Sequence, residues 1–596
     1  MPPPLIVSRR RGTDCTTPHF LIPCAVNSHT AASRRLQTLA AALSLVLLTL
    51  VTFAPALRAG FVAFDDDQNV YANSYLNPVT AHTLPRFWRA PFFELYTPVT
   101  DTIWAAAALA RGSDGAPNPA AFHALGIAFH AANVLLVFAL LCRLPLLRER
   151  SPVYAALGAA VFAVHPLQAE SVAWVTGNNN VFAGFFALLA LLIFARGGED
   201  VPRAAAWHAA AAIAFALALL AKPTVAALPL AALCLSVLVY RVPARRLAAP
   251  LAIWCLIAAA LLLVSARAAS PVRDVSLPFW QRPFIAGDAL AFYAAKLTFP
   301  VSLGIDYGRK PEWLRAQAWF YAAWLIPLAL GGLLFLRRDR TEAARYYLAG
   351  FAVFAAATAP MLGLVVFYVH RYSTVTDRYV YLSLLGVSIA VAVGLSRLPR
   401  LAVYAAAIAV LVLAALCRAQ TGVWHDSKSL FANAVRVNGR SMLGYGGLYH
   451  VYANRGDRPA AVLAAQHAVQ CPPEGEDLAA AAWGRLSDLL AEEGRNKEAI
   501  AAMRRAVAAE PTSAPWYGRL AARLSAAGDA AGAREAVAKG IAATSDAEAA
   551  AYEIGAACLH RNAPEIGVPL LTRIAAGSGA NAANAARMLQ AWRIRN

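Results

Sequence analysis

Three adjacent carboxylates, Asp65, Asp66 and Asp67, directly follow the first long apolar run of the chain. Like charges this close repel one another and raise one another's pKa, which suits a general base when cationic or apolar groups surround them. A solvated acidic turn, or a cap at the start of a helix, explains the same residues without any chemistry. The pattern alone leaves both interpretations open.

Two pairs that contain histidine could support such chemistry. His165 and Glu170 lie five residues apart on a turn between apolar runs, where they could either contact a substrate or cap a broken helix. His123 and His130 lie on one face of a predicted helix, and we interpret them as histidines inside a helical bundle. Neither pair has a third ligand, so the sequence predicts no metal site.

The composition places most of the chain in a membrane. Of the 596 residues, 59% are hydrophobic and 15% are charged, whereas about a quarter of a soluble domain is usually charged. The net charge is +19, but many Lys and Arg residues lie in short loops between apolar runs, where they act as topology signals. No nucleic-acid recognition motif occurs, so we expect no nucleic-acid partner. The eight cysteines are scattered and form no Cys-x-x-Cys pair, which argues against a zinc site or a disulfide framework.

The apolar runs predict an all-α fold whose main part is a polytopic helical membrane bundle. A spanning helix needs about 20 residues, and about eleven runs approach that length, although the third is short. The predicted spans are 36–57, 120–142, 152–165, 171–195, 204–221, 224–241, 249–266, 316–336, 345–368, 379–395 and 401–417. The polar residues 1–35 are predicted to form a disordered cytoplasmic tail.

Basic residues distinguish the two sides of this bundle. Because successive spans cross the membrane in alternating directions, every second loop lies inside. These inside loops all carry arginines, and their ranges are 143–150, 196–203, 241–246, 337–345 and 397–400. The two long loops, 58–119 and 267–315, are predicted outside, and their apolar pieces 99–110 and 284–300 are predicted to lie along the membrane surface. An odd number of spans also places everything after Cys417 outside.

From residue 424 the sequence becomes Ala-rich, charged and helical, with a period of 34 residues. The period is marked by Gly494, Gly528 and Asn562. The spacing of small, aromatic and proline residues matches the tetratricopeptide consensus, in which small residues such as Ala499 and Ala506 lie where paired helices touch. A tetratricopeptide α-solenoid is therefore predicted for 424–596, after a membrane domain at 36–423.

The acidic motif resembles one in the C-type membrane glycosyltransferases, in the branch that joins a protein O-mannosyltransferase-like membrane domain to tetratricopeptide repeats. In both, an aromatic residue and two carboxylates follow the first membrane helix, here Phe64, Asp65 and Asp66. Further segments similar to that branch follow in the same order, and they are Tyr96-Thr97-Pro98-Val99, Phe122-His123, His165-Pro166 through Glu170 to Val175, Lys222-Pro223, Asp377-Arg378-Tyr379 and Trp424-x-Asp426-Ser427. The resemblance extends from about residue 36 to the end of the chain.

Two positions depart from the family pattern. The stretch Gly177 to Asn180 stands where the family often has a basic residue and an Asp, and Thr97 stands where it often has an Arg. These positions therefore offer no basic ligand for a donor phosphate.

The resemblance implies an inverting transfer of a sugar, a mannose-like hexose, from a polyprenyl-phosphate donor to a hydroxyl acceptor, protein Ser or Thr, at the outer face. It implies that Asp65 is the general base and that Asp66 orients the base or the acceptor. The candidate ligands of the leaving phosphate are Lys222, Arg371 and Arg378, each of which could instead contact a lipid headgroup or serve as a topology signal. The candidates for substrate contact are His165 and Glu170. The resemblance implies no cofactor and no metal.

Two other functions are compatible with the sequence. One is a non-catalytic, membrane-anchored scaffold whose transferase domain is degenerate, and the other is a transferase that acts on lipid or glycan. The expected partners are membrane lipid, the polyprenyl-phosphate sugar donor, and an acceptor protein or partner complex bound by the repeats. We expect a multi-pass protein of a bacterial inner membrane with a periplasmic repeat domain.

Overall fold

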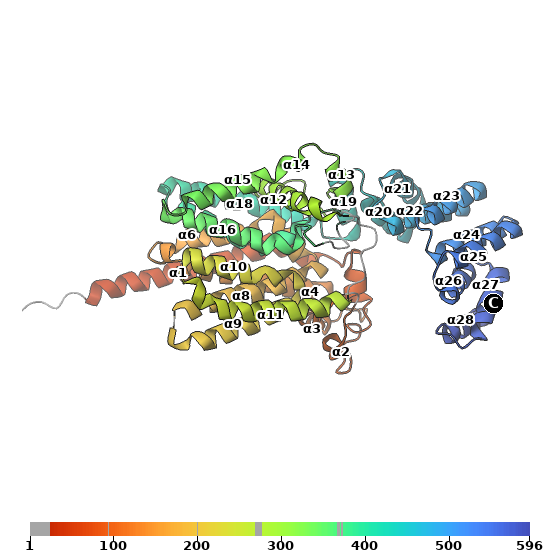
Figure 1. Cartoon of the computed structure of the whole chain (residues 1–596), viewed down its shortest axis with the longest axis horizontal. Helices are drawn as coiled ribbons and strands as arrows, with labels where there is room; N and C mark the ends of the chain where they lie inside the picture. Colours follow the sequence, from red (N-terminus) through yellow and green to blue (C-terminus); the bar gives the residue numbers. More distant parts are fainter. Residues whose placement is uncertain are drawn as a thin grey trace, which may run out of the picture.

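The computed structural model describes residues 24–92, 95–199, 201–268, 277–365, 370 and 373–595. Every regular element in these ranges is helical, which confirms the all-α prediction. The helices form a long bundle followed along the same axis by a helical solenoid (Figure 1). The chain is thus a multi-pass helical membrane protein with a helical solenoid at its C-terminal end.

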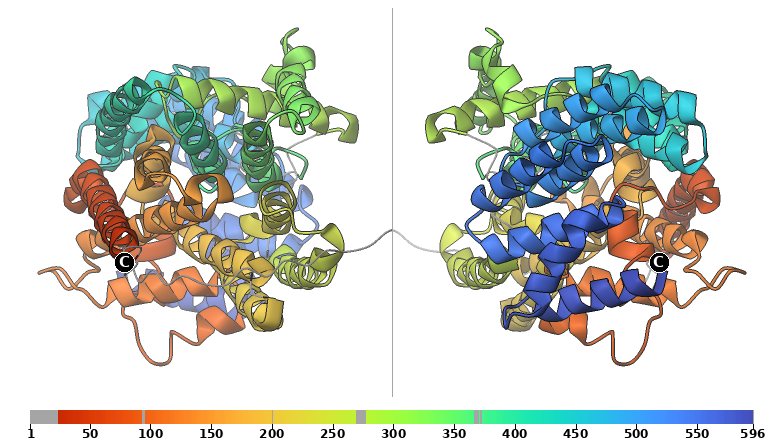
Figure 2. Two further views of the ribbon diagram at one scale, coloured as in Figure 1. Left: turned by 90° about the vertical axis from the view of Figure 1, so that its left-hand side faces the viewer. Right: turned by 90° about the vertical axis from the view of Figure 1, so that its right-hand side faces the viewer.

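The bundle consists of helices that run roughly side by side along the long axis and are seen end-on in the two turned views (Figure 2). Each predicted span overlaps one of them. They are α1 (Cys24–Phe53), α4 (Pro119–Arg143), α6 (Pro152–Val164), α8 (Asn179–Glu199), α9 (Ala204–Ala221), α10 (Leu228–Cys234), α11 (Ala244–Ala268), α15 (Leu325–Arg337), α16 (Glu342–Thr358), α17 (Leu384–Leu395) and α18 (Arg400–Gly422).

The prediction of about eleven spans exceeds what the described helices support. Within the described residues, seven helices are long and apolar enough to cross a membrane, and the count rises to eight if the pair Pro152–Val164 and Pro166–Ala173, bent by 50°, is one span. Pro166 and Pro223 each start a short 3-10 helix, which breaks the apolar runs around them. Continuous apolar sequence therefore overstates the number of straight spans.

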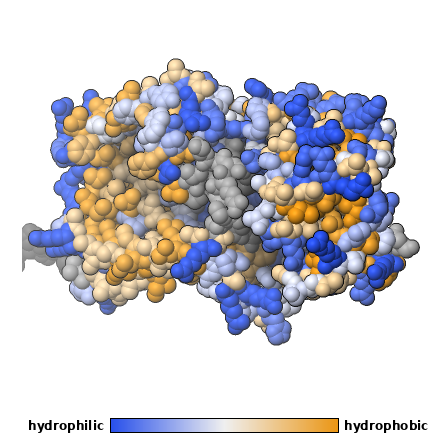
Figure 3. All heavy atoms as spheres, turned by 45° about the vertical axis from the view of Figure 1, so that its right-hand side comes forward, coloured by the Kyte–Doolittle hydropathy of each residue, from blue (hydrophilic) through white to orange (hydrophobic). Residues whose placement is uncertain are grey.

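The outer helices of the bundle present apolar side chains to the surroundings. In the most apolar part of each helix, only 6% of the residues of Phe320–Arg337 and 11% of those of Arg400–Gly422 are buried. The corresponding share for Thr176–Gly198 is 61%. Apolar side chains accordingly cover much of the bundle surface, while the solenoid shows many hydrophilic groups around an apolar patch (Figure 3). This distribution suits a bundle surrounded by lipid.

The arginine-rich loops come together at one end of the bundle. The Arg150 guanidinium donates to the carbonyl oxygen of Ser396 at 2.9 Å, and Arg397 lies 3.7 Å from the Glu342 carboxylate. The start of the first long loop, which carries Asp65, Asp66 and Asp67 and is called the acidic loop below, lies at the opposite end together with the solenoid (Figure 1). The charge asymmetry of the sequence therefore matches the two ends of the fold.

The apolar pieces of both long loops form helices. In the first loop this helix is α3 (Pro98–Ala108), and its Val99, Trp104 and Ala108 are buried where α3 packs against α9 and α4. Its location along the membrane surface stays a prediction. In the second loop, α12 (Arg282–Thr298) packs against α14 (Phe320–Ala323). A surface location for α12 stays a prediction.

The solenoid consists of antiparallel helix pairs. The pairs are α20 (Met442–Asn454) with α21 (Arg458–Gln470), α22 (Glu476–Glu492) with α23 (Asn496–Ala509), α24 (Ala514–Ala526) with α25 (Ala530–Ala542), and α26 (Ala547–His560) with α27 (Pro564–Ala575). The helix α19 (Ser427–Val437) precedes them, and α28 (Ala582–Arg595) follows. Each pair is joined by a residue with positive φ, and these residues are Gly456, Gly494, Gly528 and Asn562. Gly and Asn are the residues that adopt this left-handed conformation most readily, which explains the period.

The predicted contact between paired helices is confirmed at two alanines. Ala499 and Ala506 of α23 are fully buried, with 0% exposure. The Ser487 hydroxyl of α22 donates to the Ala499 carbonyl oxygen at 2.7 Å, so the two helices approach closely at this point. A small side chain is required there because a larger one would separate the pair.

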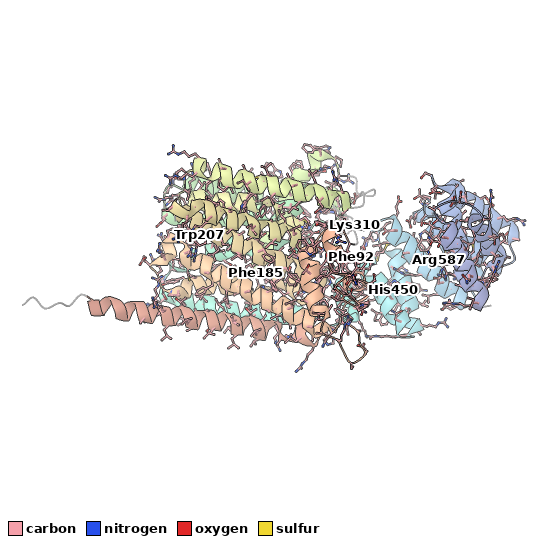
Figure 4. All side chains as sticks on the ribbon, turned by 90° about the horizontal axis from the view of Figure 1, so that it is seen from below. Phe92, Phe185, Trp207, Lys310, His450 and Arg587 are labelled. Carbon is pink, nitrogen blue, oxygen red and sulfur yellow. The ribbon has the colours of Figure 1, made fainter. Side chains whose placement is uncertain are left out.

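The segment that leads into the solenoid accepts hydrogen bonds from main-chain amides of the acidic loop. The Gly60 amide donates to the His425 carbonyl oxygen at 3.0 Å, and the Ala63 amide donates to the Ser427 hydroxyl at 2.8 Å. Figure 4 shows Lys310 where the bundle meets the solenoid, and its ammonium donates to the carbonyl oxygens of two prolines that follow α21. The start of the solenoid therefore helps to position the acidic loop.

Candidate active site

Asp65 adopts an unusual backbone conformation at the bundle end. Its φ is 66°, in the left-handed region, which non-glycine residues other than Asn and Asp rarely occupy. The residue as a whole is exposed to solvent, while neighbouring protein atoms desolvate its carboxyl and raise its pKa, opposed by attraction from Arg378. Asp65 is thus reachable from water and held close to protein charges, as a proton acceptor requires.

Asp66 is buried and fixes the loop. One of its carboxylate oxygens accepts the Val62 amide at 3.0 Å, and the other accepts both the amide and the hydroxyl of Thr176, at 2.9 and 2.7 Å. Burial raises the pKa of Asp66 to about 7, against the effect of these hydrogen bonds. With both oxygens occupied, Asp66 holds the acidic loop against the short helix Thr176–Asn178.

Aromatic rings form one side of the site. The Trp174 indole donates to the Phe64 carbonyl oxygen at 2.9 Å, and the Phe64 and Trp174 ring centroids lie 5.0 Å apart. The Trp174 ring also stacks on Trp424, with centroids 5.5 Å apart. Trp424 immediately precedes the solenoid, so this stack connects the two parts of the chain beside the acidic residues.

A buried ion pair joins two distant segments behind Trp174. Glu170, on α7 (Ala169–Ala173), accepts a hydrogen bond from the Arg378 guanidinium, and it also accepts the Asp377 amide at 3.1 Å. The two charged side chains are 2% and 11% exposed. The guanidinium carbon lies 5.3 Å from the centroid of a Trp174 ring. Arg378 is therefore oriented on two sides, and its charge acts on Asp65.

Lys222 is held by the residues that depart from the family pattern. It follows α9 directly, and its ammonium donates to the side-chain oxygens of Asn179 and Asn180, at 3.0 and 2.6 Å. Neutral amides orient Lys222 without cancelling its charge. Burial, with repulsion from Arg378, lowers the pKa of Lys222 to about 7, and attraction from Glu170 opposes this shift.

His165 lies apart from this cluster, while the placement of Arg371 falls outside the described residues. The ring of His165 is buried; one nitrogen accepts the Leu167 amide at 3.3 Å, and the other lies 3.3 Å from the Leu297 carbonyl oxygen. These contacts favour the capping interpretation for His165. The break between helices at Pro166 places His165 against α12, whereas Glu170 contacts Arg378.

The other two histidines lie inside the bundle, as interpreted from the sequence. His130 is fully buried, and its ring nitrogens lie 2.8 Å from the Tyr381 hydroxyl and 3.0 Å from the Ala163 carbonyl oxygen. His123 is also buried, 3.5 Å from the Gly60 carbonyl oxygen. In the described residues, no group of three or more His, Cys, Asp or Glu side chains could hold a metal ion.

Sequence reasoning missed Thr176, Trp174, Asn179 and Asn180 as parts of the site. Trp174 lies inside a segment quoted for the family resemblance, so it could have been chosen. In the sequence the two asparagines stand out only as departures from the family pattern, and no spacing rule pairs them with Lys222. Thr176 carries no signal, because its role depends on a loop far away in the chain.

Comparison with known proteins gives a partial relationship. No family model matches the chain. A stretch of 154 residues is 34% identical to "Protein O-mannosyl-transferase TMTC3" of Mus musculus, and the same figures hold for the protein of that name from Homo sapiens. The match covers 24% of this chain and 16% of the length of each relative. This similarity, in a multi-pass helical membrane protein, supports a relationship to membrane protein O-mannosyl-transferases.

Proposed function

We propose that the chain is an inverting membrane glycosyltransferase that moves a mannose-like hexose from a polyprenyl phosphate to a Ser or Thr hydroxyl of a protein. The observation that carries this proposal is the exposed residue Asp65, which follows Phe64 where that ring packs on Trp174, while the buried Glu170–Arg378 ion pair places its guanidinium carbon 5.3 Å from a Trp174 ring centroid. Lys222, held by Asn179 and Asn180, supplies a second cation. A proton acceptor and cations for a leaving phosphate are the two requirements of such a transfer. The partial similarity to protein O-mannosyl-transferases supports the choice of sugar and acceptor.

In the proposed reaction, the acceptor oxygen attacks the anomeric carbon as its proton passes to Asp65. The bond between that carbon and the phosphate oxygen breaks on the opposite face, so the configuration inverts. Lys222 and Arg378, with Arg371 as a further proposed ligand, stabilise the negative charge on the departing polyprenyl phosphate. Asp66 and Glu170 act by position, since Asp66 fixes the loop and Glu170 orients Arg378.

A transfer assay tests this function. Membranes from cells that express the chain are incubated with radiolabelled polyprenyl-phosphate mannose, and label is followed in protein and in lipid. We expect label in protein that is released as an O-linked sugar by β-elimination. Label that appears only in lipid or free glycan contradicts the acceptor class. No transfer with any polyprenyl-phosphate hexose favours the scaffold function instead.

We further propose that the acidic loop and the solenoid, with its tetratricopeptide repeats, lie in the periplasm of a bacterium. The collection of arginine-rich loops at the other bundle end supports this orientation. A reporter fused after Asn596 that functions only in the periplasm is expected to be active. An active cytoplasmic reporter at that position would show that the orientation is reversed.

A further inference from the structure

A cluster of arginines surrounds one carboxylate on the solenoid. Asp488, on α22, lies 2.5 Å from Arg519 and 2.8 Å from Arg523, both on α24. Arg561, which directly follows α26, approaches the same carboxylate at 2.7 Å with two nitrogens. Three successive helix pairs therefore contribute to one network.

The network carries more positive than negative charge. Three guanidiniums share the single carboxylate of Asp488, so two positive charges remain. A fourth cation, Arg485, lies on the same helix one turn before Asp488, 5.6 Å from the centroid of the Tyr449 ring. Burial, together with repulsion from Arg519, lowers the pKa of Arg485. An added anion would relieve this repulsion.

The guanidinium of Arg519 is held ready for such an anion. It lies 4.5 Å from the centroid of a Trp516 ring, and the Trp516 indole is itself fixed by a 2.7 Å hydrogen bond to Glu510. The Nε of Arg519 is buried and has no hydrogen-bond partner within the part of the chain that the structure describes. The Nη2 of Arg519 donates to Asp488 and, at 3.3 Å, to the Gly484 carbonyl oxygen, so these contacts fix the guanidinium while its charge is shared with two further arginines.

The cations follow the axis of the solenoid. Arg485 and Arg519 are 34 residues apart and therefore occupy the same place on successive units. Two cations one solenoid period apart, together with Arg523 and Arg561, match an extended ligand with several anionic groups better than one compact anion. Arginine pairs with carboxylates through two parallel hydrogen bonds, which suits Asp and Glu side chains.

We propose that this arginine surface, formed by Arg485, Arg519, Arg523 and Arg561, binds an extended acidic segment of the polypeptide that receives the sugar. That the bound polypeptide is the acceptor rests on the proposed function, whereas its acidic character rests on the solenoid alone. The surface would deliver proteins with Asp- or Glu-rich segments to the transferase.

Peptide binding to the full chain in detergent tests the proposal. Fluorescence anisotropy compares a labelled peptide of alternating Glu and Ser with the matched peptide of Gln and Ser. We expect saturable binding of the Glu peptide, weakened by added salt, and at least about tenfold weaker binding of the Gln peptide. Equal binding of the two peptides, or binding of anionic lipid vesicles in place of the Glu peptide, overturns the proposal.

Two substitutions with opposite effects strengthen the test. Arg519→Gln removes a peptide ligand and is expected to weaken binding about tenfold, whereas Asp488→Asn removes the internal competitor and is expected to tighten binding severalfold. Arg587→Gln on α28 makes the same change of charge at an exposed position of the solenoid and is expected to leave binding unchanged (Figure 4). If the network were purely structural, Arg519→Gln and Asp488→Asn would lower thermal stability without changing peptide affinity.

The outcome is separable from that of the transferase proposal. Asp65→Asn is expected to retain full peptide binding, because Asp65 lies in the first long loop whereas the arginines lie on or directly after α22, α24 and α26. Peptide binding without any sugar transfer would contradict the transferase function and would still support binding of an acidic peptide by the arginine surface. Transfer that is equally efficient with Glu and Gln peptides would keep the enzyme and reject the arginine surface.

Discussion

Replacing Asp65 by Asn is expected to slow sugar transfer by about 10²–10⁴-fold, the usual contribution of a general base. Asn has the same shape but cannot take a proton. It also tolerates the left-handed φ of 66° at this position, so the backbone should not move. The exposed side chain makes expression and thermal stability insensitive to the change. The assay is transfer from polyprenyl-phosphate sugar by membranes matched for protein level.

The neighbouring carboxylates provide graded controls for this experiment. Asp67→Asn is expected to have the smallest effect, because repulsion from Asp67 ranks behind burial and Arg378 in setting the pKa of Asp65. Asp66→Asn should lower stability as well as activity, since its new amide would meet the donors of Val62 or Thr176. Full activity of Asp65→Asn removes the proposed base, and full activity of the double Asp65/Asp66 variant supports the scaffold function.

The solenoid was more predictable from sequence than the site. A turn that needs positive φ accepts few residues, so Gly494, Gly528 and Asn562 reveal both the period and the place of each turn. Helix pairs contact their neighbours in sequence, and their packing is therefore encoded locally. The bundle was less predictable, because apolar sequence shows that a helix is present but not where a proline breaks it.

The roles within the site depend on contacts between distant segments. Asp65 and Asp66 are adjacent and chemically identical, and only the three-dimensional contact of Asp66 with Thr176 separates an exposed carboxylate from a buried one. Glu170 and Arg378 are 208 residues apart, and no spacing rule connects them. The sequence could therefore select residues for chemistry but not distinguish those that react from those that hold others in place.

Glu170→Gln is expected to lower the stability of the bundle by about 3–5 kcal/mol, because it leaves the buried Arg378 guanidinium without its counter-charge. The substitution keeps the volume of the side chain and its ability to accept the Asp377 amide. Transfer should fall as well. A guanidinium released from Glu170 would act more strongly on Asp65, lower its pKa, and make it a weaker base. The readouts are the midpoint of thermal unfolding in detergent and the transfer rate.

A second ion pair in the same chain supplies the matched control. Glu492 pairs with Arg458 on the solenoid surface, where the side chains are 51% and 66% exposed, so Glu492→Gln should cost no more than about 1 kcal/mol. In the double variant Glu170→Gln/Arg378→Gln the uncompensated charge is gone, and part of the lost stability should return while transfer stays low. Equal, small losses in Glu170→Gln and Glu492→Gln would show that the Glu170 pair is not buried in the native protein. Recovery of transfer in the double variant would instead remove Arg378 from the site, because a guanidinium that stabilises the departing phosphate cannot be replaced by a neutral amide.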